Sequence, residues 1–380
     1  MREAQQVDCS ATGKDMEANR PRRDVIKPAV AQLQAYDPYT RPGTVKLDAN
    51  EYPYGLPPAV CESMGHALAA VEIHRYPDPE AERLRHAVGR WIGINPERVL
   101  LGNGSDEVIQ MILMACGIPH GTVLTPTPTF SMYSIAAQVL DQRPVEIPLT
   151  QEWALDIPQM LASIEREQPR VIFLATPNNP TANCFQDDGV RTLIEAAPGV
   201  IVIDEAYHPF SGQTFLPLLE RYPHLIILRT LSKIGMAGLR VGILLTNPEL
   251  RTQINKVRAP YNLNAYSQAA AEIILQHWAL IAPHLTEIVR ERERLKAQLI
   301  RMPGVVVFPS QANFLLACFA GWGMKVWEAL GAQGILVRHY PESPVLADCL
   351  RITVGTPAEN EALTAALRGI LRETQPLIQT

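Results

Sequence analysis

The sequence predicts an α/β protein with a seven-stranded, doubly wound and mostly parallel sheet flanked by helices, followed by a smaller α+β unit. Two observations predict this fold. From about residue 98, short apolar runs alternate with segments of helical character, such as 105–116 and 188–197. Most of these runs are continuously apolar rather than alternating, which is typical of strands buried on both faces. The seven expected strands are residues 98–102, 122–126, 143–147, 170–175, 200–204, 225–230 and 241–246.

The smaller unit is predicted from the order of elements after the sheet. Residues 263–300 form one long helical stretch, and four strand-like runs and a closing helix at 357–372 follow it. These four runs are residues 305–308, 313–319, 334–338 and 349–354. We therefore expect four parts, which are a flexible N-terminal extension (1–24), an N-terminal arm (25–55), a large domain (56–262) and a small C-terminal domain (263–380).

The composition is that of a globular protein. Of the 380 residues, 47% are apolar and 19% are charged, which excludes a disordered chain, a collagen-like fibre and a long coiled coil. The formal net charge of −5 disfavours a nucleic-acid partner, because general nucleic-acid binders are usually basic.

Membrane, secretory and metal-binding classes are also disfavoured. Two charge-free stretches, 108–140 and 302–324, are interrupted by glycine and proline, so neither predicts a membrane span. The first twenty residues lack the apolar core of a signal peptide. The six cysteines are scattered without a C-x-x-C pair, and we expect reduced thiols in a cytoplasmic protein. The nine histidines form no H-E-x-x-H motif or Cys/His cluster, so we expect no metal.

The ends of the expected strands are where a ligand should bind in such a sheet. The first strand leads into GNGSDE (102–107), where Ser105 or Asp106 can cap a helix whose free N–H groups can bind phosphate. An ordinary strand-to-helix turn explains the same residues. The loop after the second strand would aim Phe130 into the cleft to cover a flat ring, although a core-packed phenylalanine is the alternative.

Two charged residues at later strand ends suggest chemistry. Asp204 closes an apolar strand, and because burying an unpaired carboxylate is costly, we expect a cationic partner for it. Lys233 follows the sixth strand among small residues, where a lysine can have a lowered pKa and act as a nucleophile. A lone lysine is more often a surface charge. Together, an aromatic residue, Asn, Asp, Tyr, Lys and Arg at successive strand ends suit pyridoxal 5′-phosphate.

At this point the chain resembles the fold type I pyridoxal-phosphate aminotransferases, in their histidinol-phosphate aminotransferase branch. The resemblance runs from about Lys46 to Thr356. The motifs that carry it are KLDANEYPYG (46–55), HRYPD (74–78), GNGSDE (102–107), PTPTF (126–130), TPNNPT (176–181), DEAY (204–207), LSKIGMAGLRVG (231–242) and LRITVGT (350–356). Each motif alone is weak, whereas all eight in this order are highly specific.

The resemblance implies a role for each matching residue around the cofactor ring. Lys233 would be the Schiff-base lysine and the proton carrier. Asp204 would pair with the ring nitrogen. Asn179 and Tyr207 would contact the ring oxygen, and Phe130 would stack on the ring. Lys233, Asp204 and Tyr207 are therefore the expected catalytic residues.

The same resemblance implies how phosphate groups are held. The cofactor phosphate would be bound by Ser105, Asp106, Thr230, Ser232 and Arg240. The spacing from Lys233 to Arg240 is seven, one shorter than in many relatives, a variation that occurs within this branch.

The resemblance also implies which residues meet the substrate and the second subunit. Arg338 and Arg351 would grip the substrate phosphate, together with Asn179 and with Tyr36 from the N-terminal arm. Tyr76 would reach the cofactor phosphate of a neighbouring subunit, which predicts a homodimer.

The expected reaction is transamination between L-histidinol phosphate and 2-oxoglutarate, a step of L-histidine biosynthesis. An aromatic amino-acid aminotransferase and a threonine-phosphate decarboxylase share the fold and remain open, because function depends on the site. A cofactor-sensing regulator is disfavoured, because the residues before 46 show no helix-turn-helix pattern.

Overall fold

The computed structural model describes residues 25–33 and 45–374. The chain divides into two compact units, residues 1–38 and 39–380. In the first unit, the described element is the short helix α1, Pro28–Ala31. All elements and sites discussed below belong to the second unit.

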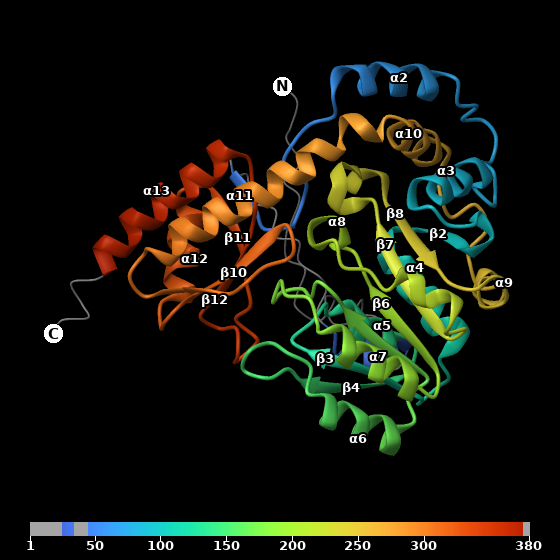
Figure 1. Ribbon diagram of the computed structural model, residues 1–380, viewed down its shortest axis with the longest axis horizontal. Coiled ribbons are helices and arrows are strands. Elements are labelled where there is room, and N and C mark those ends of the chain that lie inside the picture. Colours follow the sequence, from blue (N-terminus) through green and yellow to red (C-terminus); the bar gives the residue numbers. More distant parts are fainter. Residues whose placement is uncertain (1–24, 34–44, 375–380) are drawn as a thin grey trace, which may run out of the picture. The chain divides into compact units, whose positions relative to one another are not determined.

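The second unit contains the expected seven-stranded sheet (Figure 1). All seven predicted strands are confirmed, and every neighbouring pair is parallel except those of the strand Val241–Leu245. In spatial order the strands are β2 (Val99–Asn103), β8 (Val241–Leu245), β7 (Leu225–Thr230), β6 (Val200–Asp204), β5 (Val171–Ala175), β3 (Thr122–Thr127) and β4 (Arg143–Pro148).

The central strands are apolar throughout because each face of the sheet is covered by helices. Within β6, Ile203 belongs to one hydrophobic core and Val202 to the other. One face is covered by α4 (Gly104–Cys116), α5 (Met132–Val139) and α9 (Pro248–Asn255). The other face packs against α2 (Pro58–Ala69), α3 (Glu82–Ile92), α6 (Ile157–Glu167), α7 (Asp187–Ala196) and α10 (Ala265–Gln276). The helices expected at 105–116 and 188–197 are confirmed as α4 and α7.

The long helical stretch expected at 263–300 is broken, contrary to the prediction. It consists of α10, the short helix η6 (Trp278–Leu280) and α11 (Ala282–Ile300). Pro283 explains the break, because it lies at the start of α11, where a proline is tolerated, and could not sit inside a continuous helix. The first half of α11 packs in the large core through Leu285, and its second half packs in the small core through Leu299.

The small unit contains a five-stranded sheet (Figure 1). Its four predicted strands and closing helix are present, but two further elements were not expected, namely β1 and α12 (Gly323–Ala332). In spatial order the strands are β1 (Val45–Leu47), β11 (Ile335–His339), β12 (Cys349–Thr353), β10 (Phe314–Phe319) and β9 (Val305–Val307), and the closing helix is α13 (Pro357–Thr374). Strand β1 pairs with β11, so the chain segment after Leu47 starts from the edge of the small sheet. The domain boundary near residue 262 stays a prediction.

The expectation of reduced thiols is wrong for one pair of cysteines. Cys318 and Cys349 form a disulfide, because the antiparallel register of β10 and β12 places them directly opposite each other. Cys61, Cys116 and Cys184 are free, and Cys9 lies outside the described residues.

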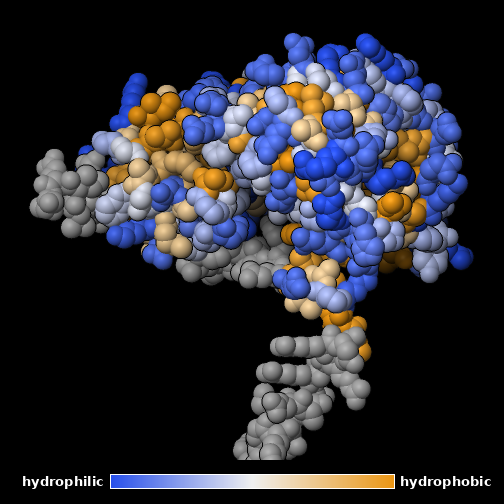
Figure 2. Space-filling view, turned by 90° about the horizontal axis from the view of Figure 1, so that it is seen from below, coloured by the Kyte–Doolittle hydropathy of each residue, from blue (hydrophilic) through white to orange (hydrophobic). Residues whose placement is uncertain are grey.

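Over the described ranges, the helices include none with both the length and the apolar character needed to span a bilayer. The charge-free stretch 108–140 is divided between α4, β3 and α5. On the face shown in Figure 2, hydrophobic residues form small separate groups among hydrophilic ones.

Candidate active site

The candidate site lies at the carboxyl edge of β5, β6 and β7. These three strands are parallel neighbours, so the residues that follow them meet at one edge of the sheet. Asn179 follows β5, Asp204 ends β6 and Lys233 follows β7. The sequence prediction that these residues share one edge is thus met by the topology.

Lys233 lies in an irregular helical turn, Ser232–Met236, directly after β7. Its Nζ donates to the carbonyl oxygen of Ala49 at 3.2 Å and lies 5.9 Å from the centre of the Tyr207 ring. Burial, together with the positive charge of Arg351, lowers the pKa of Lys233 from 10.5 to about 8. An amine with this pKa has a substantial neutral, nucleophilic fraction near neutral pH.

Asp204 is 5% exposed and is bound by two neutral donors. The Tyr133 hydroxyl donates to Oδ2 at 2.7 Å, and the Ala206 amide donates to Oδ1 at 2.9 Å. Burial raises the pKa of Asp204, while these two hydrogen bonds lower it. Among the described residues no Lys, Arg or His forms an ion pair with Asp204, so the expected cationic partner is not supplied by this part of the chain.

Tyr133 was not predicted as a site residue. Its ring is fully buried, stacked on Phe173 at 4.6 Å between ring centres. Burial and the neighbouring Asp204 carboxylate raise the pKa of Tyr133 well above its ordinary value, so its hydroxyl stays a donor. The sequence signal was its position in PTPTFSMY, three residues after Phe130 and at the start of a helix.

Tyr207 is held by a second residue that the sequence prediction did not single out. The side-chain amide of Asn50 donates to the Tyr207 hydroxyl at 2.9 Å, and the Tyr207 ring packs edge-on against Phe314. Burial raises the pKa of Tyr207 to about 12. Asn50 is 1% exposed and has a left-handed backbone with φ 53°, a conformation that asparagine tolerates better than most residues. Its location in the KLDANEYPYG motif was the available signal.

Arg351 connects the small sheet to the edge of the large one. Its Nη1 donates to Asn179 Oδ1 at 2.7 Å, and its Nη2 donates to the carbonyl oxygen of Asp48. The third nitrogen, Nε, is buried and has no partner among the described residues. Arg338 lies directly opposite Arg351 in the register of β11 and β12, so both arginines lie on one face of the small sheet.

The expected phosphate-binding residues meet at the start of α4. Arg240 Nη2 lies 2.9 Å from Asp106 Oδ2, and a Cβ placed on Gly104 would collide with the same guanidinium group. A Cβ on Gly242 would lie 2.6 Å from the amide nitrogen of Ser105. The two glycines therefore allow Arg240 and the start of α4 to approach each other closely.

The hydroxyls near this cradle differ in how fully they are bonded. Thr230 Oγ1 has two acceptors within reach, the Val241 carbonyl oxygen at 3.2 Å and Ser232 Oγ at 3.0 Å, and it accepts from the Ser232 amide at 3.1 Å. Ser105 Oγ is buried without a partner in the described part of the chain. A buried polar atom without a partner is costly unless a ligand satisfies it, and together with Arg240 and the helix start, these hydroxyls form a set of donors suited to a phosphate.

The remaining predicted residues are placed as follows. Phe130 is half-buried, with its ring edge-on to Tyr133 at 5.6 Å between centres. Tyr76 is 80% exposed and stacks on Tyr261 with 4.5 Å between ring centres, so no contact within the described chain brings it to Lys233. Tyr36 lies outside the described residues.

The donor set fits pyridoxal phosphate. Asp204 would hold the protonated ring nitrogen. That nitrogen would be the cationic partner expected for Asp204, which the described residues do not supply. Lys233 offers a partly neutral amine, and the phosphate would occupy the cradle of Ser105 and Arg240. Within the ranges described, no group of three or more His, Cys, Asp or Glu side chains could hold a metal ion.

Comparison with known proteins defines the class to which this fold and site belong. Residues 42–367 match the family model for aminotransferase class I and II. Histidinol-phosphate aminotransferase 2 of Bordetella parapertussis is 43% identical over 350 residues, which cover 91% of this chain and 96% of that protein. The chain belongs to the class I and II aminotransferases and, within them, to the histidinol-phosphate aminotransferase family. The resemblance inferred from the motifs is confirmed.

Solved structures support the same assignment. Histidinol-phosphate aminotransferase from Sinorhizobium meliloti, in complex with pyridoxal-5′-phosphate, matches with a TM-score of 0.84 at 26% identity, covering 94% of this chain and 99% of that one. L-threonine-O-3-phosphate decarboxylase from Porphyromonas gingivalis matches with a TM-score of 0.75 at 22% identity, covering 86% and 99%, and shares the fold. The expected fold type I architecture and cofactor are confirmed.

Proposed function

We propose that this protein transfers the amino group of L-histidinol phosphate to 2-oxoglutarate with pyridoxal phosphate, giving imidazole acetol phosphate and L-glutamate in L-histidine biosynthesis. The observation that carries the substrate assignment is the register pairing of Arg338 with Arg351 on one face of the small sheet, with Arg351 bonded to Asn179 at the cofactor edge. Two neighbouring guanidinium groups suit a dianionic phosphate, and one of them can also bind a carboxylate of glutamate.

The chain's own residues divide the work of the reaction. Pyridoxal phosphate, when bound, supplies an aldehyde that captures the substrate amine and a ring that withdraws electrons from the substrate Cα. Lys233 Nζ would hold the cofactor until the substrate amine displaces it, and the released amine would then take the proton from the substrate Cα. Asp204 would keep the ring nitrogen protonated, and Tyr133 and the Ala206 amide orient its carboxylate.

The residues around this edge would hold each part of the cofactor. Asn179 and Tyr207 would bind the ring oxygen, and Asn50 orients the Tyr207 hydroxyl. Phe130 would cover the ring. The backbone of Ser105 and Asp106, the hydroxyls of Thr230 and Ser232, and Arg240 would bind the phosphate.

We further propose that the enzyme is a homodimer in the cytoplasm, in which Tyr76 of one subunit contacts the cofactor phosphate of the other. The exposure of the Tyr76 ring, which stacks on the partly exposed Tyr261, supports this proposal, because a second chain could cover both rings. Tyr36 would complete the substrate pocket.

A substrate panel tests the proposal. Purified holoenzyme is incubated with 2-oxoglutarate and one amino donor at a time, which is L-histidinol phosphate, L-phenylalanine or L-threonine O-phosphate. Both glutamate and carbon dioxide are measured in each reaction. We expect kcat/KM for histidinol phosphate to exceed that for phenylalanine at least about tenfold, or about 1.4 kcal/mol. Carbon dioxide release from threonine phosphate, or a preference for phenylalanine, would move the function to one of the two alternatives.

The variant Arg338→Ala tests where the substrate phosphate binds, with glutamate as the comparison substrate. It should reduce kcat/KM for histidinol phosphate far more than for glutamate, because only the former carries a phosphate. Equal losses for both substrates would show that the phosphate is bound elsewhere.

A further inference from the structure

A cavity of about 290 Å³ adjoins the candidate active site. It opens between the end of α3, the short helix α8 (His208–Ser211), η6 and the start of α11. Neither Lys233 nor Asp204 lines this cavity, but Glu205 and Arg229 do. Thr230, whose hydroxyl is proposed to hold the cofactor phosphate, also lines the cavity, and Glu205 directly follows Asp204 in the chain. The cavity therefore adjoins the proposed phosphate cradle.

Arg229, which lines the cavity, has one guanidinium nitrogen without a hydrogen-bond partner among the described residues. Its Nε and Nη2 donate to Glu205 Oε2 at 3.0 and 2.8 Å, and Nη2 also donates to Thr214 Oγ1 at 2.9 Å. Nη1 makes no hydrogen bond with the residues that the structure describes, although the Arg229 side chain is only 9% exposed. Because Glu205 already balances the charge of Arg229, the cavity offers a donor without a net positive charge.

His208 presents a complementary acceptor. Its Nδ1 lies 3.0 Å from the carbonyl oxygen of Gln213, and a carbonyl can only accept, so Nδ1 carries the hydrogen. Burial and the charge of Arg229 lower the pKa of His208, which favours the neutral ring at pH 7. In that ring Nε2 is an acceptor, and it has no partner in the described part of the chain.

The walls of the cavity are aromatic. Trp91 and Trp278 meet edge-to-face with 5.1 Å between ring centres, and Leu285 adds an apolar surface. Indole rings bind flat ligands by stacking and edge contacts. A cavity of this volume, at the small end of the range for ligand sites, has room for one or two fused rings.

We propose that this cavity binds a neutral, planar nitrogen heteroaromatic ligand. One ring nitrogen accepts a hydrogen bond from Arg229 Nη1, one N–H donates to His208 Nε2, and the ring lies against Trp91 and Trp278. A charged ligand is disfavoured, because it would add an unbalanced charge beside an ion pair that is already neutral.

Benzimidazole is the probe, because its five-membered ring carries one acceptor nitrogen and one N–H and is fused to a benzene ring, and 1-methylbenzimidazole is its matched control without the N–H. Both are titrated calorimetrically into the unmodified holoenzyme at pH 8. We expect saturable binding of benzimidazole and an affinity for the methylated compound that is about tenfold lower, since one hydrogen bond is lost. Equal affinities, or no saturable binding of benzimidazole, would overturn the proposal.

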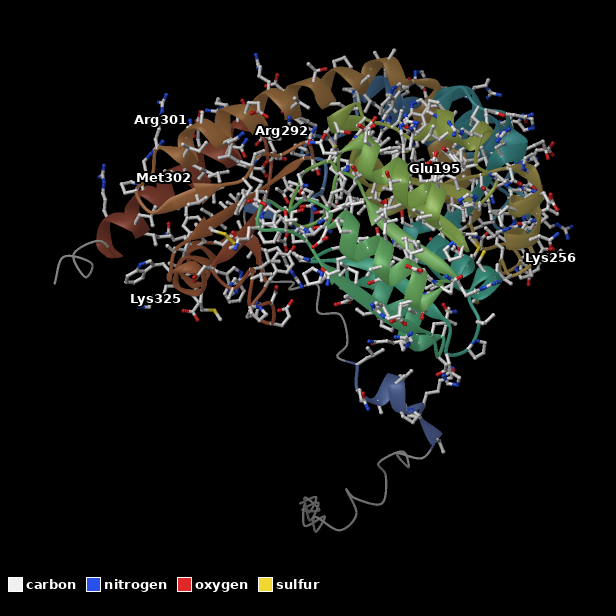
Figure 3. All side chains as sticks on the ribbon, turned by 60° about the horizontal axis from the view of Figure 1, so that its bottom comes forward. Glu195, Lys256, Arg292, Arg301, Met302 and Lys325 are labelled. Carbon is white, nitrogen blue, oxygen red and sulfur yellow. A yellow bond between two sulfur atoms is a disulfide. The ribbon has the colours of Figure 1, made fainter. Side chains whose placement is uncertain are left out.

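Protein variants locate the probe. His208→Asn keeps a donor for the Gln213 carbonyl but removes the acceptor, and Trp91→Leu removes one wall. Each should weaken benzimidazole binding about three- to tenfold. Trp322→Phe is the control for loss of a tryptophan, because Trp322 lies at the start of α12 in contact with Lys325 and does not line the cavity. Figure 3 labels Lys325.

A variant of the proposed substrate site separates the two pockets. Arg351→Gln should leave benzimidazole binding unchanged if the cavity is the binding site. Binding that is lost in Arg351→Gln but retained in Trp91→Leu would place the probe in the substrate pocket and overturn the proposal, while leaving the proposed transamination intact.

Discussion

Arg351 Nη1 donates a hydrogen bond of 2.7 Å to Asn179 Oδ1, which joins strand β12 of the small sheet to the loop that follows β5 of the large sheet. A second donation from Nη2 to the Asp48 carbonyl fixes the plane of the guanidinium group. The arginine is therefore oriented by the protein itself, and its buried Nε remains for a ligand.

Replacement of Arg351 by lysine should separate binding from cofactor capture. Lysine keeps the positive charge but cannot reproduce the planar fork. We expect the KM for glutamate and for histidinol phosphate to rise about tenfold or more, since a charge-assisted hydrogen bond contributes about 1.5–3 kcal/mol. The visible spectrum of the bound cofactor should stay unchanged. Unchanged KM values would show that Arg351 does not bind substrate.

Lys233→Ala should abolish the visible absorbance band of cofactor bonded to a lysine, because Lys233 is the lysine that directly follows β7 at this edge of the sheet. Lys256→Ala is the matched control, since Lys256 is exposed at the end of α9 (Figure 3). A band that survives in Lys233→Ala would mean that another lysine binds the cofactor.

Tyr133→Phe tests whether the hydroxyl of this tyrosine positions Asp204. The substitution removes one of the two donors to a buried carboxylate, which costs about 1–3 kcal/mol. We expect kcat to fall about tenfold or more, with little change in the KM for glutamate. Tyr222→Phe removes another tyrosine hydroxyl that binds a carboxylate, that of Glu195, and should leave kcat near normal. Equal effects of the two variants would contradict a specific role for Tyr133.

The lowered pKa of Lys233 predicts how cofactor capture depends on pH. Only the neutral amine attacks an aldehyde. With a pKa of about 8, roughly 10% of Lys233 is neutral at pH 7, against about 0.03% for a lysine with a pKa of 10.5. The rate at which cofactor-free enzyme gains the visible band should therefore rise with pH and level off above about pH 8. A rate that keeps rising tenfold per pH unit to pH 10 would show that the pKa is not lowered.

Gly242→Ala should disrupt the phosphate cradle. The added methyl group would lie 2.6 Å from the Ser105 amide nitrogen, which is backbone and cannot move aside easily. We expect a loss of about 1–3 kcal/mol in the free energy of unfolding, together with weaker cofactor binding. Gly369→Ala is the control, because Gly369 lies in α13 with no atom within 4 Å of its added Cβ. That variant should gain about 0.5–1 kcal/mol in chemical denaturation.

The large sheet could be predicted from sequence because its signal is local. Continuous apolar runs such as residues 171–175 report burial on both faces, and the helices between them follow from periodicity. By contrast, β1 is three residues long and pairs with β11 almost 300 residues later. No local pattern contains that pairing. The same limit applies to the disulfide, because Cys318 and Cys349 become neighbours only through strand register.

The site was predictable where residues are chemically distinctive and was missed where they act through another side chain. Asp204 and Lys233 are conspicuous at the ends of apolar strands. Tyr133 and Asn50 lie within recognised motifs, but their importance comes from hydrogen bonds to Asp204 and Tyr207, residues 71 and 157 positions away. Such partners can be identified only once the chain is folded.

The most direct test of the central claim is an absorbance scan of the purified holoenzyme before and after histidinol phosphate is added, followed by 2-oxoglutarate. We predict a visible band that is replaced by the spectrum of the pyridoxamine form of the cofactor and returns when 2-oxoglutarate is supplied. A band that does not respond to histidinol phosphate but does respond to another amino donor would contradict the assigned substrate. The absence of any band after pyridoxal phosphate is added would contradict the role of Lys233.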